Sequence, residues 1–252
     1  MKVLEAALSA GAPVEAIYAD PSALRHPQSA ALLERGRELG VRIVMLRSGV
    51  MERVADAVTP QPICAVVGFV DVPLAALTGG ADPAAGLGET SSPAGAAAGP
   101  LLVCVDVRDP GNLGALVRVA DAAGAGGVVA CAGTADLYGP KTVRASAGSL
   151  FHVPVVVAGS AVEVLGTLGQ VGYTRLGTLA RGGRDYVDLD LSGKLALVFG
   201  NEASGLGREV GGLLEGGVTV PMRGGAESLN VAMTATVLCF EIERRRRATA
   251  PT

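Results

Sequence analysis

The sequence contains few of the side chains on which many enzyme classes depend. Among its 252 residues are two histidines, four cysteines and no tryptophan. With only His26 and His152 available, neither a histidine base nor a histidine-ligated metal has much support, so we expect no metal. His152, in the stretch SLFHVPVVV, is interpreted as a packed strand residue. The cysteines form no C-x-x-C pair, so we expect buried free thiols instead of disulfides or a zinc site.

Long apolar runs and several well-known motifs are also absent. No apolar run reaches the roughly 18 residues that a membrane span needs, and the N-terminus lacks a basic segment followed by an apolar one. We therefore expect a soluble cytoplasmic protein with no membrane partner. The motifs G-x-G-x-x-G, G-x-x-x-x-G-K-[ST] and G-x-S-x-G do not occur. Dinucleotide-binding, P-loop and α/β-hydrolase interpretations thus lose their usual support.

Basic residues are not in excess. The formal net charge is −3, and residues 101–252 carry 14 basic and 14 acidic side chains. Composition alone does not indicate a nucleic-acid partner, although a local basic surface is compatible with these counts. Hydrophobic residues make up 49% of the chain, which is enough for a sizeable core.

A segment rich in small residues divides the chain. Residues 78–100, TGGADPAAGLGETSSPAGAAAGP, have no hydrophobic period and are interpreted as a flexible linker. Before it, residues 1–77 alternate between amphipathic helical stretches such as SAALLERGRELG and strand-like stretches such as VRIVML. This alternation predicts a small α/β domain, which we interpret as a binding module because it has no cluster of polar residues.

The longer region, residues 101–252, has a more regular pattern. Continuous Val/Leu runs such as LLVCVDV and KLALVFG alternate with helical segments, and the last helix is predicted over LNVAMTATVLCFEIERRRR. Fully apolar strands between helices predict a mostly parallel sheet that is covered on both faces. Ligands of such sheets bind at the carboxyl ends of the strands, so polar residues that directly follow strands are the candidates for a site.

Three loops that follow predicted strands stand out. In DVRDPGNLGALVR, Asn112 occupies a predicted helix N-cap and Arg118 follows six residues later. A turn, a cap and an exposed arginine would also account for this loop. In LVFGNEASGLGREV, Gly200 would allow a ligand to approach the main chain and Glu202 would lie at the end of the sheet. A plain loop in which Ser204 caps the next helix is the alternative.

The third loop, GGAESLN, precedes a helix that is apolar on every side, so we expect that helix to be buried, in part against another subunit. Neither Ser228 nor Asn230 has the Glu or Gln three residues later that a capping box requires. Burying polar residues at the start of such a helix costs free energy unless they form hydrogen bonds, within the protein or to a ligand. Capping explains one of them, but not the whole set.

Together the three loops resemble the motifs of the SpoU (TrmH-type) family of RNA ribose 2′-O-methyltransferases, in the SPOUT superfamily. An asparagine followed six residues later by arginine matches PGNLGALVR, and a strand that ends in Gly-Asn-Glu matches LVFGNEASGLG. Pro-Met followed by Ser-Leu-Asn-Val matches VPMRGGAESLNVA. The similarity covers about residues 101–247, and residues 1–77 resemble the L30e-like domain that many members carry in front.

This resemblance implies an α/β fold in which the C-terminal parallel sheet contains a deep trefoil knot. It implies S-adenosylmethionine as cofactor, RNA (rRNA or tRNA) as partner, and a homodimer packed through the C-terminal helix. The residues that match the family's cofactor-binding positions are Thr178, Gly200, Val220, Met222 and Leu229.

The family also assigns a central catalytic role to the arginine of the first motif, here Arg118, which acts across the dimer interface in one version of the mechanism. Because a guanidinium stays protonated, Arg118 would act by fixing a phosphate or by orienting the 2′-oxygen, unless its environment is strongly perturbed. Asn112, Glu202, Ser228 and Asn230 would position the ribose and this arginine, and Arg108 and Arg144 would contact RNA.

Two other functions fit parts of the same pattern. An RNA-binding protein of this fold could bind the cofactor without catalysing transfer, but all three motif cores are complete. A metabolic α/β enzyme that binds a nucleotide is the second, and the missing glycine fingerprint argues against it. The arginines at 244–247 would either bind phosphates or form a solvated helix end.

Overall fold

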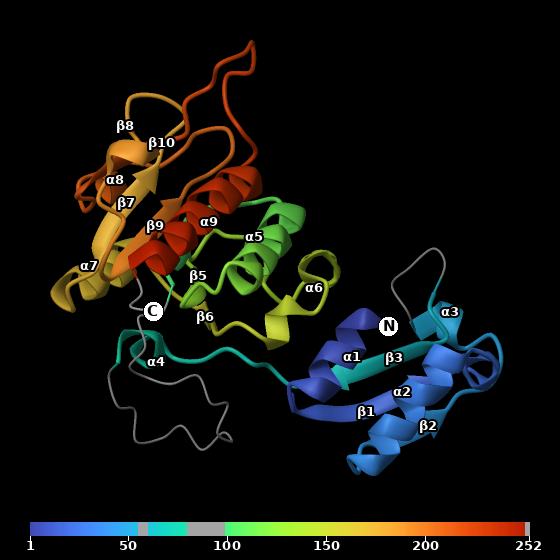
Figure 1. Ribbon diagram of the computed structural model, residues 1–252. Coiled ribbons are helices and arrows are strands. Elements are labelled where there is room, and N and C mark those ends of the chain that lie inside the picture. Colours follow the sequence, from blue (N-terminus) through green and yellow to red (C-terminus); the bar gives the residue numbers. More distant parts are fainter. Residues whose placement is uncertain (55–59, 80–98, 250–252) are drawn as a thin grey trace. The chain divides into compact units, whose positions relative to one another are not determined.

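The computed structural model describes residues 1–54, 60–79 and 99–249, and the chain divides into two compact units. The smaller comprises Met1–Val70 together with Ala147–His152, and the larger comprises Asp71–Ser146 and Val153–Thr252. Both units combine helices with a sheet, as expected (Figure 1). Most of the segment interpreted as a linker lies outside the described residues.

The smaller unit contains a three-stranded mixed sheet. Its elements from the first 70 residues are α1 (Lys2–Ser9), β1 (Val14–Ala19), η1 (Pro21–Arg25), α2 (Pro27–Glu38), β2 (Arg42–Met45), α3 (Met51–Val54) and β3 (Ile63–Val67). The strand order is β2-β1-β3, with β2 parallel and β3 antiparallel to β1. Ile17 and Leu33 are fully buried in its core. A Cβ at Gly36 would lie 2.7 Å from Ile17 Cδ1, so glycine permits the close approach of α2 to the sheet.

A short segment from the middle of the chain also belongs to the smaller unit. Residues 147–152 contain η2 (Ser149–Phe151), which contacts α1. A Cβ at Gly148 would lie 2.6 Å from Ala6 Cβ, and Leu150 is buried. The sequence predicts one continuous helical segment here. Instead α6 (Pro140–Ser146) ends, and the chain turns through positive φ at two successive residues. His152 ends η2 and is exposed, so its interpretation as a packed strand residue is wrong.

The boundary between the units falls earlier than residue 77. Helix α4 (Leu74–Thr78) was not predicted, and Leu74 and Leu77 pack against the core of the larger unit. The Val72 N–H donates to the Val155 carbonyl at 2.9 Å, which also fixes this segment to the larger unit. At five residues, α4 is too short to show a helical period in the sequence.

The larger unit is built on a seven-stranded sheet whose pairings are all parallel, in the order β6-β5-β4-β9-β7-β10-β8. Its strands are β4 (Leu101–Cys104), β5 (Gly127–Ala130), β6 (Val155–Val157), β7 (Thr174–Thr178), β8 (Arg184–Asp185), β9 (Leu195–Phe199) and β10 (Gly216–Thr219). The remaining elements are α5 (Pro110–Ala122), α7 (Ala161–Gln170), η3 (Tyr186–Asp188), α8 (Arg208–Gly211) and α9 (Val231–Thr249). The expected parallel sheet is confirmed.

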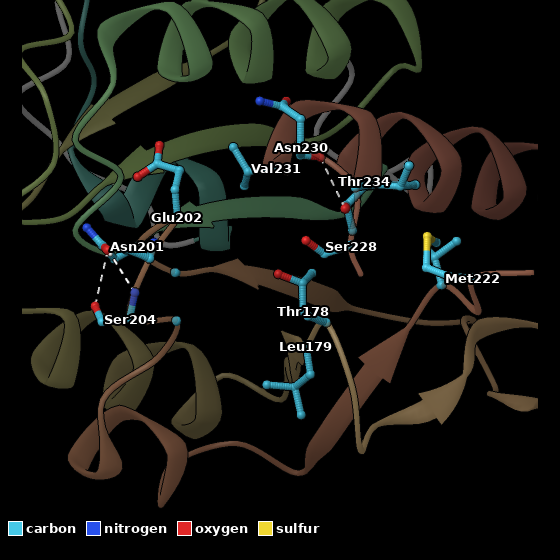
Figure 2. A pocket seen from close by; sticks show the side chains of 16 residues that line it. Thr178, Leu179, Asn201, Glu202, Ser204, Met222, Ser228, Asn230, Val231 and Thr234 are labelled. Atoms are coloured by element: carbon cyan, nitrogen blue, oxygen red, sulfur yellow. Dashed lines mark hydrogen bonds between the residues drawn. The ribbon is translucent and has the colours of Figure 1, made fainter. Parts of the chain in front are cut away.

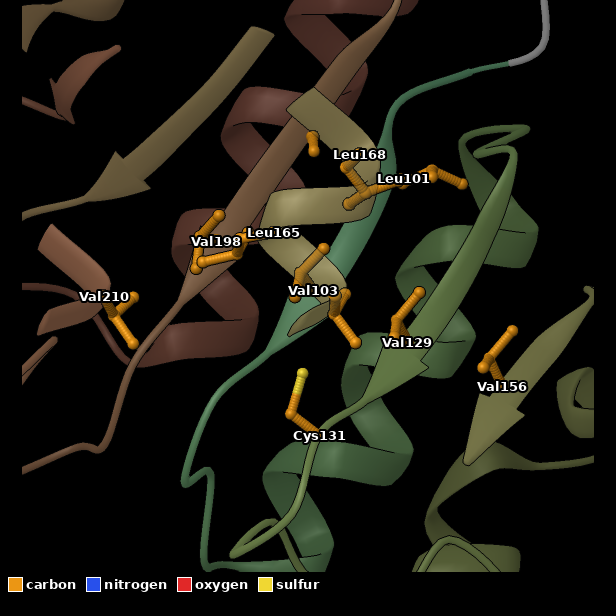
Figure 3. Packing of buried hydrophobic residues seen from close by; sticks show 11 residues of the cluster. Leu101, Val103, Val129, Cys131, Val156, Leu165, Leu168, Val198 and Val210 are labelled. Atoms are coloured by element: carbon orange, nitrogen blue, oxygen red, sulfur yellow. The ribbon is translucent and has the colours of Figure 1, made fainter. Parts of the chain in front are cut away.

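Helices cover both faces of this sheet, which explains the continuous apolar strands. Side chains of alternate strand residues, among them Val103, Val129 and Val198, pack against Leu165 and Leu168 of α7. Figure 3 shows this cluster, with α5 and α9 behind the strands on the opposite face. Because side chains alternate between the two faces, strands covered on both sides need apolar residues at every position.

Helix α9 is buried on one side only within the single chain. Ala235, Leu238 and Cys239 are inaccessible, whereas Met233 and Phe240 are 60% and 47% exposed. The expectation of complete burial is therefore not met by the protomer itself. In the described part of the chain, no helix has the length and apolar character of a membrane span.

Candidate active site

A pocket of about 460 Å³ lies at the carboxyl ends of β7, β9 and β10. The loops that follow these three strands supply its lining, and Figure 2 shows Glu202 on one side, Met222 on the other, and Ser228 and Thr178 between them. This is the edge of the sheet at which ligands of parallel α/β folds bind. The lining residues are Thr178, Leu179, Ala180, Gly200, Asn201, Glu202, Ala203, Ser204, Gly205, Val220, Met222, Ser228, Leu229, Asn230, Val231 and Thr234.

The loop after β9 is organised by the side chain of Asn201. Its Oδ1 accepts hydrogen bonds from the backbone N–H groups of Ala203 and Ser204, each at 3.0 Å, and from the Ser204 hydroxyl at 3.1 Å. Its Nδ2 donates to the Asp106 carbonyl at 3.0 Å, which joins this loop to the one after β4. Asp106 has φ +56, an uncommon conformation for a residue with a side chain. Ser204 does not cap α8; Gly207 occupies that position.

The start of α5 differs from the sequence prediction in a way that matters for the site. Pro110 is the first helical residue and Asp109 is the N-cap, accepting the Asn112 N–H at 2.8 Å. Proline suits this position because its missing N–H would have no partner in the first turn. Asn112 is therefore not the cap, and its side-chain amide is available for other contacts.

The Asn112 amide connects two loops of the site. Its Nδ2 donates to Glu202 Oε1 at 2.8 Å, and its Oδ1 accepts from Asn230 Nδ2 at 2.9 Å. Asn230 Oδ1 in turn accepts the Ala232 N–H at 2.9 Å, so Asn230 caps α9 and holds Asn112 at the same time. The carboxylate can only accept and the backbone N–H can only donate, so the two ends of this chain fix the orientation of both amides.

Glu202 is held as a carboxylate. Partial burial opposes its ionisation, but hydrogen bonds from Asn112 Nδ2 and from nearby backbone N–H groups outweigh this effect and lower the pKa. One of these groups is the Arg108 N–H, at 3.4 Å from Oε2. A carboxylate with a lowered pKa accepts a proton poorly near neutral pH, so Glu202 is better suited to positioning than to general base catalysis.

All five residues predicted to bind a cofactor line the pocket: Thr178, Gly200, Val220, Met222 and Leu229. The reason for glycine at position 200 differs from the expected one. A Cβ there would lie 2.6 Å from the carbonyl carbon and oxygen of Gly205. These atoms belong to the loop itself, where Asn201 and Gly205 form a bridge. Gly200 is thus required by the tight loop, whatever the ligand.

The predicted arginines lie elsewhere. Arg118 is exposed on α5 and is not a lining residue of the pocket. Arg144 is exposed on α6, which packs against α5. Arg108 is exposed, and its Nε pairs with Asp106 Oδ1 at 2.9 Å. Among the predicted catalytic residues, the fold brings together Asn112, Glu202 and Asn230 by hydrogen bonds and Ser228 by its place in the lining. It does not bring Arg118 to the pocket.

Sequence reasoning missed several lining residues. Leu179 and Ala180 directly follow the carboxyl end of β7, but they are apolar, and the rule that selected Glu202 considers only polar residues after strands. Thr234 lies one turn into α9, and Asn201 was matched only as part of a motif. The contacts of Asn201 depend on the fold of its loop, so they could not be predicted from the sequence.

Comparison with known proteins places this site in context. A model of the SpoU rRNA Methylase family matches residues 99–240, which contain all three loops. The 23S rRNA (guanosine(2553)-2′-O)-methyltransferase RlmP of Bacillus subtilis is 35% identical over 207 residues, covering 81% of this chain and 74% of that protein. The 23S rRNA (uridine(2479)-2′-O)-methyltransferase of Streptomyces viridochromogenes is 39% identical over 142 residues, covering 54% and 50%.

Solved structures extend the similarity over nearly the whole chain. The AdoMet-bound rRNA methyltransferase from Sinorhizobium meliloti superposes with a TM-score of 0.77 at 25% identity, covering 100% of this chain and 86% of that chain. The SpoU methyltransferase AviRb from Streptomyces viridochromogenes, in complex with AdoMet, superposes with a TM-score of 0.78 at 28% identity. It covers 98% of this chain and 88% of that chain.

Proposed function

Because the chain belongs to the SpoU rRNA methylase family, we propose that it transfers a methyl group from S-adenosylmethionine (AdoMet) to a ribose 2′-hydroxyl of RNA. The observation that carries this function is the meeting of the three loops, with Asn112, Glu202 and Asn230 in one hydrogen-bonded chain beside the pocket. Ribosomal RNA is the proposed substrate class, since both curated relatives compared above are named for 23S rRNA.

The pocket suits AdoMet. Its volume of about 460 Å³ is within the range of ligand sites. Leu179, Met222 and Leu229 offer apolar surface, and the backbone at Gly200 and Val220 offers hydrogen-bonding groups. When bound, AdoMet supplies an electrophilic methyl group. We assign Thr178, Gly200, Val220, Met222 and Leu229 to its binding.

The chain's own residues have to orient the ribose and handle its proton. A ribose hydroxyl is a weak nucleophile until it begins to lose its proton. Glu202 keeps a lowered pKa, so in this proposal it positions Asn112 and does not take the proton. Asn112, Ser228 and Asn230 orient the ribose. A guanidinium does not deprotonate, so Arg118 holds the 2′-oxygen or the neighbouring phosphate.

We further propose a homodimer packed through α9, which would explain why Arg118 does not line the pocket of its own chain. Met233 and Phe240 are seven residues apart on α9, about two turns, so both project from the same side of the helix. A partner helix would cover them. In this arrangement the partner subunit's Arg118 completes each pocket, which requires two copies of the chain.

Two structural proposals follow from the family. The first is a deep trefoil knot in the C-terminal part of the larger unit. The sheet order supports it, because the chain passes from β6 across to β7, inserts β9 between β4 and β7, and then places β10 between β7 and β8. The second is that the smaller unit is an L30e-like domain that binds RNA. Its α/β build supports this, as do Arg42 and Arg47, which are exposed at either end of β2.

A methyl-transfer assay tests the proposed function. Radiolabelled AdoMet is incubated with rRNA and tRNA from a strain that lacks this gene, with AdoMet binding measured by calorimetry in parallel. We expect transfer to rRNA, located at a 2′-oxygen, and a loss of at least about 100-fold in rate for Arg118→Ala with AdoMet binding retained. Binding of AdoMet without transfer to any RNA would support the alternative, an RNA-binding protein that does not catalyse.

A further inference from the structure

Two loops that share the sequence Arg-Gly-Gly border the pocket. Loop 180–183, Ala-Arg-Gly-Gly, follows β7, and loop 222–225, Met-Arg-Gly-Gly, follows β10. Ala180 and Met222, the first residue of each loop, line the pocket. The next residue in each, Arg181 and Arg223, is exposed. The two arginines are therefore the cations that stand closest in sequence to the lining of the pocket.

An ion pair joins the first loop to the chain that follows the second. Arg181 Nη2 lies 3.4 Å from Glu227 Oε1, and the side chains are 75% and 87% exposed. Glu227 precedes Ser228, another lining residue, so this pair forms beside the pocket. An ion pair so exposed to water is weak, so another anion can readily replace Glu227 as the partner of Arg181. Among the described residues, no carboxylate pairs with Arg223.

The first loop has fixed ends. Thr219 Oγ1 donates to the Leu179 carbonyl at 3.0 Å and accepts the Gly183 N–H at 3.1 Å, so one side chain of β10 holds both ends of the turn. Gly182 has φ +81, which glycine adopts without strain. Arg181 is thus presented at the tip of an anchored turn, and only its side chain has to move to change partner.

Among the residues that the structure describes, the pocket lining of a single chain offers no positive charge to an RNA strand. Within the described part of the chain, Glu202 is the one ionisable side chain of this lining and is held as a carboxylate, and Glu227 adds a second negative charge nearby. A ribose cannot reach the pocket without its two flanking phosphates, and both carboxylates would repel them. The partner subunit's Arg118 can reach the 2′-oxygen or one phosphate at most, so productive binding needs further cations at the rim of the pocket, the segments 180–183 and 222–228 that border its lining.

We propose that Arg181 and Arg223 bind the RNA phosphates that flank the target ribose. Glu227 forms an ion pair with Arg181 in the absence of RNA, and a phosphate replaces Glu227 when RNA binds. This inference rests on the proposed function, because it presumes that the ribose is presented to this pocket. Arg181 and Arg223 are positioning residues: they fix the strand and touch no reacting atom. Glu227 keeps Arg181 close to the rim and weakens the binding of any anion that does not also gain other contacts.

Salt dependence of RNA binding tests the assignment without relying on catalysis. The probe is an unmodified 23S rRNA transcript, bound at a series of salt concentrations. The logarithm of the RNA-binding constant falls linearly with the logarithm of the salt concentration. Each lost phosphate contact makes this slope shallower by about 0.7–1. We expect this loss for Arg181→Ala and for Arg223→Ala, and about twice the loss for the double variant. Arg181→Lys keeps the charge and should keep most of the slope.

Two further variants sharpen the test. Lys194→Ala is the matched control, because Lys194 is exposed and precedes β9, at the opposite edge of the sheet; its slope should equal that of the wild type. Glu227→Gln releases Arg181 and should tighten RNA binding about twofold to fivefold. Weaker binding by Glu227→Gln would overturn the role given to this carboxylate.

Calorimetry with AdoMet distinguishes an effect on RNA binding by these two arginines from an effect on the cofactor pocket. We expect the same AdoMet affinity in Arg181→Ala, Arg223→Ala and wild type, with kcat/KM for RNA reduced about tenfold by each substitution. A double variant with an unchanged salt slope, or a parallel fall in AdoMet affinity, would overturn the inference. A wild-type protein that transfers no methyl group to RNA would instead refute the proposed function, while the salt slopes would still decide whether the rim binds phosphate.

Discussion

Asn230 Nδ2 donates a hydrogen bond to Asn112 Oδ1 at 2.9 Å, joining residues that are 118 positions apart in the chain. Asn230 also caps α9 through its Oδ1, so one side chain sets the start of a helix and the geometry of the site. The two roles use different ends of the amide, and a substitution can separate them.

Asn230→Asp is expected to keep the cap of α9 and to lose the hydrogen bond to Asn112 in the site. Aspartate accepts the Ala232 N–H as well as asparagine does, but it has no N–H to donate to Asn112. We predict that thermal stability changes by less than about 1 kcal/mol while methyl transfer falls at least about 100-fold. Ser160→Ala removes the cap of α7, whose Ser160 accepts the Val162 N–H, and serves as control. It should cost about 1 kcal/mol and leave the rate unchanged. Retained activity in Asn230→Asp would show that the contact with Asn112 is dispensable.

Gly200→Ala should damage the pocket through the loop after β9. The added Cβ would lie 2.6 Å from the backbone of Gly205, so the loop has to open. We expect about 1–3 kcal/mol of destabilisation and at least tenfold weaker AdoMet binding, measured by urea unfolding and calorimetry. Gly166→Ala is the matched control, since Gly166 lies within α7 and an added Cβ there comes within 4 Å of no described atom. Equal behaviour of the two variants would contradict the steric argument.

Glu241 should contribute to stability in a defined pH range. Hydrogen bonds from Arg244 and Arg245 lower its pKa to about 2, from an ordinary value of 4.5. Because the folded state has the lower pKa, this stabilisation is present above about pH 4.5 and is lost as the pH falls toward 2. Glu241→Gln should therefore be less stable than the wild type at pH 7, and the difference should shrink between pH 4.5 and 2 in urea titrations. A difference that is constant with pH would assign the effect to packing instead.

Mixing two inactive variants tests whether Arg118 acts across a dimer. In a heterodimer of Arg118→Ala and Asn230→Ala, one pocket has an intact Asn230 and faces the partner's intact Arg118. Random pairing makes about half of the dimers heterodimers with one complete site each, so about a quarter of wild-type activity should return. If Arg118 served its own chain, the mixture would stay inactive.

A control for the mixing experiment comes from α9. Phe240→Glu places a charge on the exposed apolar side of the helix and should yield monomers in analytical ultracentrifugation. Introduced into both inactive chains, it should abolish the recovery of activity. Persistence of a dimer would place the interface on another surface.

The sheet could be predicted because its central strands β4 and β9 are apolar at every position. Residues 101–104 and 195–199 are buried throughout, and only strands covered on both faces have that pattern. The two-residue strand β8 and the five-residue helix α4 were missed, because so few residues carry no period. Tertiary pairing alone defines such elements.

The candidate site was predictable to the level of loops and no further. The rule that polar residues after parallel strands converge selected Glu202 and Asn230, and the fold places both at the pocket. The partners of the Asn112 side chain could not be read from the sequence, because Glu202 and Asn230 are 90 and 118 positions away and only the fold brings them to its amide. A motif match also does not locate a side chain. Arg118 matches the first motif, but it does not line the pocket of its own chain.

Residues 147–152, inserted from the second half of the sequence into the smaller unit, mean that this unit cannot be removed by cutting the chain once. Deleting residues 1–70 would remove α1, which Gly148 approaches and η2 contacts, and would leave the residues around the buried Leu150 without part of their surroundings. An aggregating truncation would then be mistaken for proof that the missing part recognises RNA. Surface point substitutions in the full-length protein, such as Arg42→Ala, are the fair way to ask what the smaller unit does.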